Sequence, residues 1–345
     1  MFDLRSLVLV LLASTAAAQE GNARAETIAR TSSFAKAALA FIESQAAQLH
    51  EPALKAAVKA LLANPAPTFM SRYPDAAART RAHQALATAG LIDPAKVAPT
   101  GLFPPLPDPA KAPQSFLAAP GGITGGHHSY PGGLAEHTAF NLQSALDLET
   151  NYRKRYGITD LDHDLVIAAP ILHDSMKTWC LQWRADGTEL DQATIAGTAS
   201  HHIFILAEVL HRGLSADLAV SVAGAHEPPH LNEEKVAGFL RAAALLAGVD
   251  PVQRGLLRSD GKLARPPPIE AAINHLSDHD YVLAEPTEQV VLAALGEALG
   301  TSGLPASERR WQALQAQARV PALALYAALR SRGPAAVREL LRSKP

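Results

Sequence analysis

The chain has 345 residues, of which 48% are hydrophobic and 19% charged, and its formal net charge is −2. This length can bury one large core or two modest ones, and the near-neutral charge lacks the excess of Lys and Arg with which duplex nucleic-acid binders contact phosphates. The single cysteine excludes an internal disulfide framework and a Cys-rich zinc module.

Residues 1–18 have the layout of a secretory signal peptide. Arg5 precedes the apolar run LVLVLLA, and the small residues AAA at 16–18 precede Gln19. A run this short does not span a bilayer, which takes about 20 apolar residues. We therefore expect cleavage after Ala18, a periplasmic or secreted mature protein and no stable membrane span. A buried first helix is the alternative.

The next part of the chain, residues 19–114, is expected to form alanine-rich helices followed by a linker. Stretches such as SFAKAALAFIESQAAQLH and PALKAAVKALLA place apolar residues at helical spacing. Pro65 and Pro67 end this pattern. The proline-dense stretch PTGLFPPLPDPAKAP over residues 99–113 is typical of an extended linker.

From residue 134 onward, long helical patterns alternate with short Gly, Pro and Asp breaks, and strand-like alternation is scarce. The loop RSDGKLARPPP precedes a helix expected to begin near Ile269. After residue 304 the pattern predicts two amphipathic helices and a polar tail, within C-terminal helices over residues 291–345. The chain as a whole is therefore predicted to be all-α.

Histidine is concentrated in the middle of the chain, because all of the fourteen histidines except His50 and His83 fall between residues 127 and 279. Imidazole is the commonest protein ligand for transition metals and titrates near neutral pH. Five segments each place His, Asp or both on or beside an apolar helix: HHSYPGGLAEHT, ILHDSMK, SHHIFILAEVLH, AHEPPH and NHLSDHDYV.

The segment ILHDSMK is the most informative of the five. The apolar run VIAAPIL leads directly into His173 and Asp174, and charged side chains are rarely buried unless they are paired or bound to a metal. His163 and Asp164 form a second His-Asp pair, but it precedes its helix, where Asp is a favoured cap or first-turn residue. This second pair also lacks a Lys four positions later, and we assign it no chemistry.

These motifs, in this order, resemble the HD superfamily of metal-dependent phosphohydrolases. The stretch FLAAPGGITGGHHSYPGGLAEHT is similar to the entry to the first metal-binding helix in the branch that contains 3′→5′ exoribonucleases. LHDSMK resembles the His-Asp-x-x-Lys signature of that branch, and PPIEAAINHLSDHD its closing segment. The resemblance covers residues 115–290 and implies an HD-domain helical bundle with additional N- and C-terminal helices.

The resemblance implies a set of metal ligands: His137, His173, Asp174, His202, His226 and Asp278. In two-metal members the position of Asp174 bridges the ions, and those of His202 and His226 hold the second ion. His201 is the alternative to His202. The sequence spacing from His202 to Ala207 and Glu208 is closer to the His-x-x-x-x-Ala-Glu pattern of the family.

The resemblance also implies roles in catalysis and substrate binding. Asp174 and Lys177 are expected to act in catalysis, and His127, His128 and Lys177 to line the substrate pocket. Lys177 follows His173 by one helical turn on the same face, where its ammonium group can meet a substrate phosphate.

Imidazole and carboxylate ligands suit one or two ions of Mn, Fe, Co, Ni or Zn better than Mg, which prefers oxygen ligands. A metal at this site would supply hydroxide from water at neutral pH. The expected function is hydrolysis of a phosphomonoester or phosphodiester, with a nucleotide-like small molecule as substrate. The alternatives are a diiron oxygenase on the same scaffold and a non-catalytic metal-binding helical protein.

Overall fold

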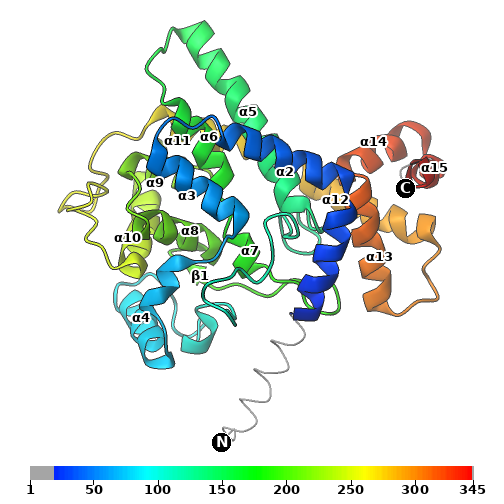
Figure 1. Cartoon of the computed structure of the whole chain (residues 1–345), viewed down its shortest axis with the longest axis horizontal. Coiled ribbons are helices and arrows are strands. Elements are labelled where there is room, and N and C mark those ends of the chain that lie inside the picture. Colours follow the sequence, from blue (N-terminus) through cyan, green and yellow to red (C-terminus); the bar gives the residue numbers. More distant parts are fainter. Residues whose placement is uncertain (1–18, 344–345) are drawn as a thin grey trace, which may run out of the picture.

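The computed structural model describes residues 19–343, and in this range it confirms an all-α fold (Figure 1). The strands are a hairpin of two short segments, β1 Thr194–Ile195 and β2 Thr198–Ala199, besides two isolated bridges. The predicted signal peptide lies outside the described residues, so export and cleavage after Ala18 stay predictions. None of the described helices is long and apolar enough to cross a membrane.

Residues 19–31 are helical, and short 3-10 turns occur at Thr68–Arg72 (η1) and Pro99–Gly101 (η2). The remaining helices in chain order are α2 Ser33–Ala46, α3 Pro52–Ala63, α4 Ala76–Thr88, α5 Gly133–Tyr156, α6 His163–Leu172, α7 Lys177–Cys180, α8 Ser200–His211, α9 Ala216–Gly224, α10 Glu233–Ala247, α11 Ile269–Ser277, α12 Tyr281–Leu299, α13 Ala306–Arg319, α14 Ala322–Arg332 and α15 Pro334–Ser343.

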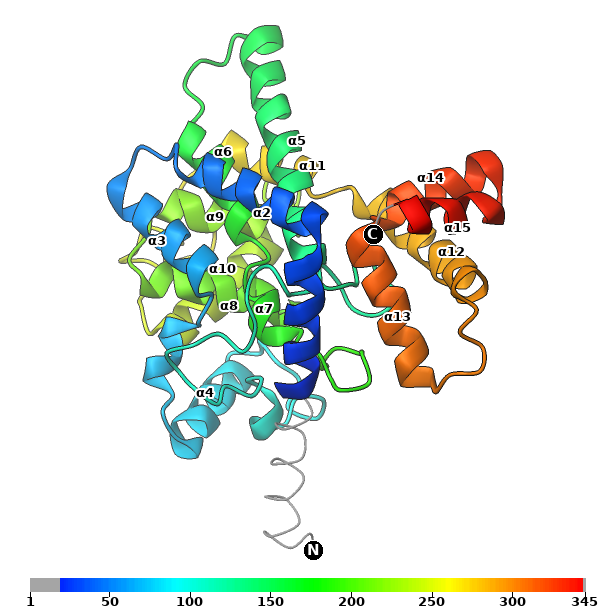
Figure 2. The same ribbon diagram turned by 45° about the vertical axis from the view of Figure 1, so that its right-hand side comes forward.

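The N-terminal helices form where their caps predict. The side chain of Ser32 accepts a hydrogen bond from the Ala35 amide at the start of α2, and Asp75 accepts one from Ala78 at the start of α4. Pro52 occupies the first turn of α3, where its missing N–H costs nothing. The alanine-rich stretch is therefore helical, as expected, and α2 packs across α5 (Figures 1 and 2).

One continuous apolar core joins this N-terminal part to the middle of the chain, and it runs from Ile42 to Ala271. A buried carboxylate fixes the junction: Glu208 on α8 accepts hydrogen bonds from the Thr68 hydroxyl at 2.6 Å and the Phe69 amide at 3.0 Å. The domain limits 19–114, 115–290 and 291–345 are untested by this packing and stay predictions.

A glycine pair sets the entry to α5. Gly132 adopts a left-handed conformation with φ of 101°, which favours glycine. A Cβ atom on Gly133 would lie 1.9 Å from the His128 carbonyl oxygen. The segment that carries His127 and His128 can therefore fold tightly against the first turn of α5 only if residue 133 has no side chain.

The C-terminal region contains one helix more than the sequence pattern predicts. Gly333, with φ of 76°, ends α14, and Pro334 begins α15, a third helix after residue 304 where the pattern predicted two. Ala336, Val337 and Leu341 are buried on one side of α15, so packing against the neighbouring helices stabilises this segment. Helices α12–α15 group to one side of the larger bundle (Figure 2).

Glu288 on α12 is buried between α13 and the segment that precedes α5. It accepts hydrogen bonds from the Gln317 amide and from the Ser129 hydroxyl, the latter at 3.4 Å. Burial outweighs these two hydrogen bonds and raises the pKa of Glu288 from 4.5 to about 7. The folded state therefore binds a proton on Glu288 that the unfolded state releases above pH 4.5.

We predict that Glu288→Gln flattens the fall in stability of the protein between pH 5 and pH 8. The stabilisation from protonated Glu288 is fully present below pH 4.5 and is lost as the pH rises through about 7. The difference between these pKa values corresponds to at most about 3 kcal/mol. Thermal unfolding across this pH range measures the effect, with Glu297→Gln, at an exposed position of α12, as the control. Identical pH profiles for all three proteins would contradict the prediction.

Candidate metal centre

The His-Asp pair of the strongest motif lies in a turn between two helices. Helix α6 ends at Leu172, and α7 begins at Lys177. The His173 Nδ1–H group donates a hydrogen bond to the Pro170 carbonyl oxygen at 2.8 Å, which leaves the lone pair on Nε2 free for a metal. The turn therefore fixes both the direction and the tautomer of the His173 ring.

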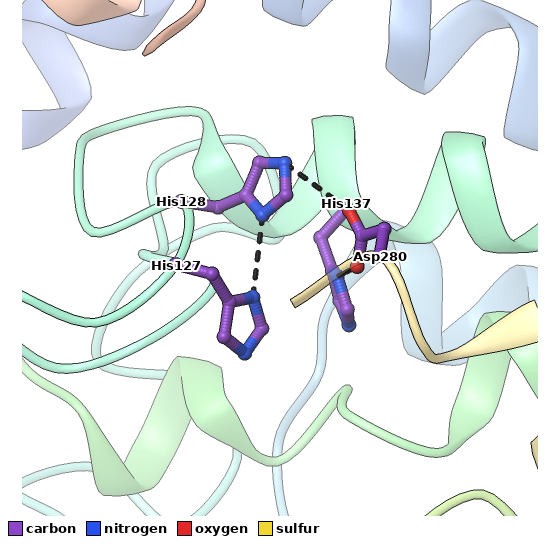
Figure 3. A group of neighbouring side chains, drawn as sticks. All are labelled: His127, His128, His137 and Asp280. Atoms are coloured by element: carbon purple, nitrogen blue, oxygen red, sulfur yellow. Dashed lines mark hydrogen bonds and ion pairs between the residues drawn. The ribbon is translucent and has the colours of Figure 1, made fainter. Parts of the chain in front are cut away.

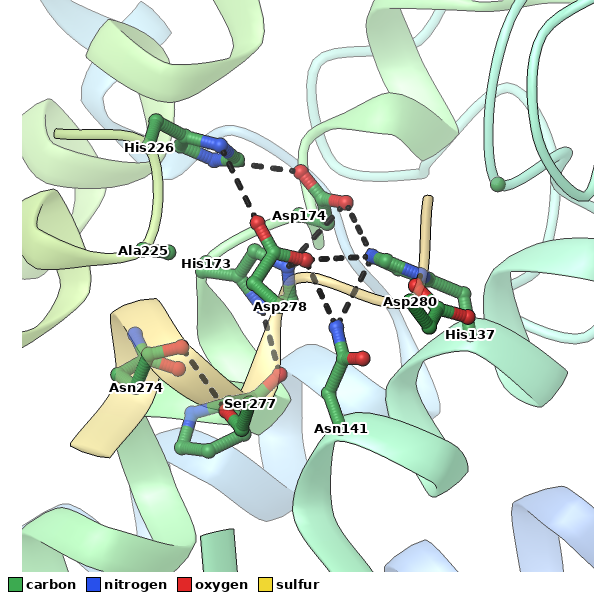
Figure 4. A network of polar contacts seen from close by, with 12 residues as sticks. His137, Asn141, His173, Asp174, Ala225, His226, Asn274, Ser277, Asp278 and Asp280 are labelled. Atoms are coloured by element: carbon green, nitrogen blue, oxygen red, sulfur yellow. Dashed lines mark hydrogen bonds and ion pairs between the residues drawn. The ribbon is translucent and has the colours of Figure 1, made fainter. Parts of the chain in front are cut away.

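Four predicted metal ligands from three parts of the chain meet at this turn (Figure 4). His137 Nε2 on α5 lies 3.0 Å from Asp278 Oδ1 and 3.2 Å from Asp174 Oδ2. His173 Nε2 lies 3.3 Å from each of the same two oxygen atoms. Asp278 comes directly after α11, so the packing of α5, α6 and α11 assembles this group.

The spacing and chemistry of these atoms fit a metal ion. In the described part of the chain, His173 Nε2, Asp174 Oδ1, His201 Nε2 and His226 Nε2 are buried without a hydrogen-bond partner. Two ligands at right angles around one ion are about 3 Å apart when each metal–ligand bond is about 2.1 Å. Two imidazoles and two carboxylates suit transition metals such as Mn, Fe, Co, Ni and Zn.

The charges of the four groups depend strongly on one another. Burial alone would raise the pKa of Asp174 and of Asp278, but the adjacent histidines hold both pKa values well below the ordinary range. In return, and against the effect of burial, the carboxylates raise the pKa of His173 to about 9 and that of His137 well above its ordinary value. A metal that binds here therefore displaces protons from imidazoles.

Asp174 also belongs to a second group of possible ligands, together with His201, His202 and His226. His201 Nε2 lies 3.2 Å from Asp174 Oδ1, and its Nδ1–H group donates to Gln192 Oε1 at 2.7 Å. His226 Nε2 lies 3.5 Å from the same oxygen atom of Asp174. Asp174 thus stands between two clusters, as a bridging ligand would.

The structure brings both His201 and His202 into this second group, but their rings differ in orientation. The His202 ring stacks on the His226 ring with centroids 3.3 Å apart, and its Nδ1 lies 2.5 Å from the Thr198 hydroxyl. His201, by contrast, directs Nε2 at Asp174. The geometry therefore favours His201, the sequence-based alternative, as the ligand nearest to Asp174.

Further polar side chains hold the ligands in place. Asn141, one turn after His137 on α5, donates a hydrogen bond to Asp278 Oδ1 at 2.8 Å. Asp280 Oδ1 lies 3.4 Å from His137 Nδ1, and the His275 ring donates to the Ala225 carbonyl at 2.9 Å, directly before His226. Asn141 was not among the predicted site residues, although its spacing of four residues from His137 places both on one helix face.

His127 and His128 lie beside His137 and Asp280 (Figure 3). Their Nδ1 atoms lie 3.2 Å apart, and His128 Nε2 lies 3.5 Å from Asp280 Oδ2. Burial lowers the pKa of His127 to about 2 and that of His128 to about 4, so both rings are neutral at pH 7. With His137 and Asp280 they form another group whose possible ligand atoms all lie within 4.8 Å of one another.

A cavity of about 580 Å³ opens beside the two ligand groups. His127 lines this cavity, whereas the buried His128 is not among the residues of its wall. Lys177 lines the cavity but does not follow His173 on one helix face, because the turn separates α6 from α7. Its ammonium group contacts the Asp174 carboxylate and donates to the Gly121 carbonyl.

The second His-Asp pair has a structural role, as the sequence analysis inferred. Asp164 lies in the first turn of α6 and accepts hydrogen bonds from the backbone amides of His50 and Glu51, at 2.9 and 2.7 Å. It thereby fixes the turn between α2 and α3. His163 contacts Glu149 at 2.8 Å and lies outside the ligand groups.

Comparisons with known proteins give one informative match. The dihydroneopterin 2′,3′-cyclic phosphate phosphodiesterase of Methanocaldococcus jannaschii is 32% identical to this chain over 116 residues. The match covers 31% of this chain and 43% of that relative, so the chain spans less than half of the relative's length. No protein-family model and no solved structure matches the chain.

We predict that His173→Ala lowers the amount of transition metal bound per chain, whereas His163→Ala does not. Both substitutions remove the histidine of a His-Asp pair, but only His173 Nε2 faces two buried carboxylates. Elemental analysis after loading with Mn, Co or Zn measures the difference, and we expect the metal affinity of His173→Ala to fall by at least about tenfold. Equal metal content in the two variants would be inconsistent with the site.

Proposed function

We propose that this protein is a metal-dependent phosphohydrolase of the HD type that hydrolyses a phosphodiester or phosphomonoester of nucleotide-like size. The observation that carries the proposal is that His137, His173, Asp174 and Asp278 meet around shared carboxylate oxygens. The HD resemblance implies these same four residues as metal ligands. The phosphodiesterase relative supports the same reaction class.

The donor groups give the site its chemistry. A transition metal held there would supply hydroxide at neutral pH, because coordination lowers the pKa of water to about 7. Lys177 lies against Asp174 and offsets part of the negative charge at the cavity wall, which favours an anionic phosphoester.

We further propose two metal positions, with Asp174 shared between them and His201 and His226 completing the second. His201 takes precedence over His202 in this proposal because Gln192 holds its ring with Nε2 directed at Asp174. His202 then supports His226 by ring stacking.

The cavity argues for a small substrate. A volume of about 580 Å³ falls within the range of about 300–1,000 Å³ that is usual for small-molecule sites. The formal net charge of −2 offers no general attraction to a polynucleotide. A nucleotide or a similar phosphoester therefore fits better than a duplex nucleic acid.

We predict that the purified protein hydrolyses bis(p-nitrophenyl) phosphate or a nucleoside 2′,3′-cyclic phosphate, and that EDTA abolishes this activity. Added Mn, Co, Ni, Zn or Fe should restore it. Asp174→Asn should lower kcat by at least about a thousandfold, because it removes the charge shared by both ligand groups. Steady-state assays on the two substrates provide the measurement.

Asp147→Asn, at an exposed position of α5, the helix that carries His137, is the matched control and should keep full activity. Hydrolysis that persists at the wild-type rate in metal-free protein, or in Asp174→Asn, would refute the proposed function. Consumption of O₂ by a protein with two bound irons would instead favour the oxygenase alternative.

A further inference from the structure

We propose that the part of the cavity beside α12 binds a planar heterocycle that carries N–H donors, with Tyr281 stacking on the ring and Glu285 accepting its hydrogen bonds. This inference rests on the proposed function, because it assigns the phosphate of the same substrate to the metal end of the cavity.

The wall of this part of the cavity is a stripe along one helix face. Tyr281, Glu285 and Gln289 are spaced by four residues on α12 and therefore lie above one another on the same side. Tyr281 and Glu285 line the cavity. Gln289 donates a hydrogen bond to the Gly125 carbonyl at 2.7 Å, which ties the stripe to the loop on the cavity wall.

Three of the five residues that this loop contributes to the cavity wall are glycines. Gly122, Gly125 and Gly126 line the cavity together with Ile123 and Thr124. Gly125 has φ of +83°, and a Cβ atom there would lie 2.4 Å from Gln289 Nε2, so a larger residue would disturb the link to α12. At the glycine positions a flat ligand can approach the backbone closely.

Tyr281 supplies an aromatic surface at a defined place. The residue is 40% exposed, and its ring centroid lies 6.1 Å from that of His127 and 5.4 Å from that of His279. The His127 centroid in turn lies 4.9 Å from that of the predicted metal ligand His137. His127 thus stands between the metal end and Tyr281, and a phosphoester that spans this distance places its other end against the tyrosine.

The charged residues that line the cavity also differ between its metal end and its α12 wall. Among the described residues that line it, Lys177 is the only lysine or arginine, and it contacts Asp174 at the metal end. The α12 wall offers the Glu285 carboxylate, which can only accept hydrogen bonds when it is ionised. An anionic group is therefore disfavoured beside Glu285, and a ring with amino or imino N–H groups is favoured.

Equilibrium binding to the metal-loaded full chain tests this assignment with two ligands that differ only in the base, guanosine 5′-monophosphate and ribose 5-phosphate. Calorimetry should give an affinity about ten- to a hundredfold higher for the nucleotide, the range expected for stacking of one base on an aromatic side chain. Tyr281→Ala should remove most of this preference and leave the affinity for ribose 5-phosphate unchanged.

Tyr281→Phe, which keeps the ring, and Val282→Ala, at the exposed neighbouring position, should both retain the preference. Glu285→Gln should weaken binding of the nucleotide alone. Equal affinities of the wild type for the two ligands, no binding of either, or an unchanged preference in Tyr281→Ala would overturn the inference. Because binding requires no turnover, these results are independent of whether the protein hydrolyses phosphoesters.

Discussion

The buried carboxylate of Asp174 is the constraint on which the rest of the site depends. Its side chain is 1% exposed, and a buried carboxylate is strongly destabilising unless cations and hydrogen-bond donors surround it. The residues that surround it come from separate elements of the fold: His137, His173, Lys177, His201 and His226. The helical bundle therefore brings distant parts of the chain to one charge, and the proposed metal ion would explain why so many imidazoles face it.

The supporting hydrogen bonds orient the candidate ligands before any metal binds. The Pro170 carbonyl and Gln192 select the tautomers of His173 and His201, and Asn141 holds Asp278. Ligands that are already oriented lose little conformational freedom when a metal binds. The continuous core between the N-terminal helices and the middle of the chain gives these positions a common rigid support.

The sequence was sufficient to predict the all-α fold, because apolar periodicity is a local signal. The residues that meet at the primary group were identified by the resemblance of their motifs to the HD superfamily. The sequence was insufficient where the outcome depends on packing. His201 and His202 are neighbours on α8, and only the position of Gln192 and His226 distinguishes the directions of their rings. Likewise, the contribution of Tyr281 to the cavity wall depends on how α12 follows α11, which no local pattern records.

The central claim is that an ion binds between His137, His173, Asp174 and Asp278. Anomalous X-ray scattering from crystals of the metal-loaded protein, measured on both sides of the metal absorption edge, tests it most directly. The account predicts a peak about 2.0–2.3 Å from the four ligands, and a second peak beside Asp174, His201 and His226. Full metal loading with peaks only elsewhere in the molecule would contradict it.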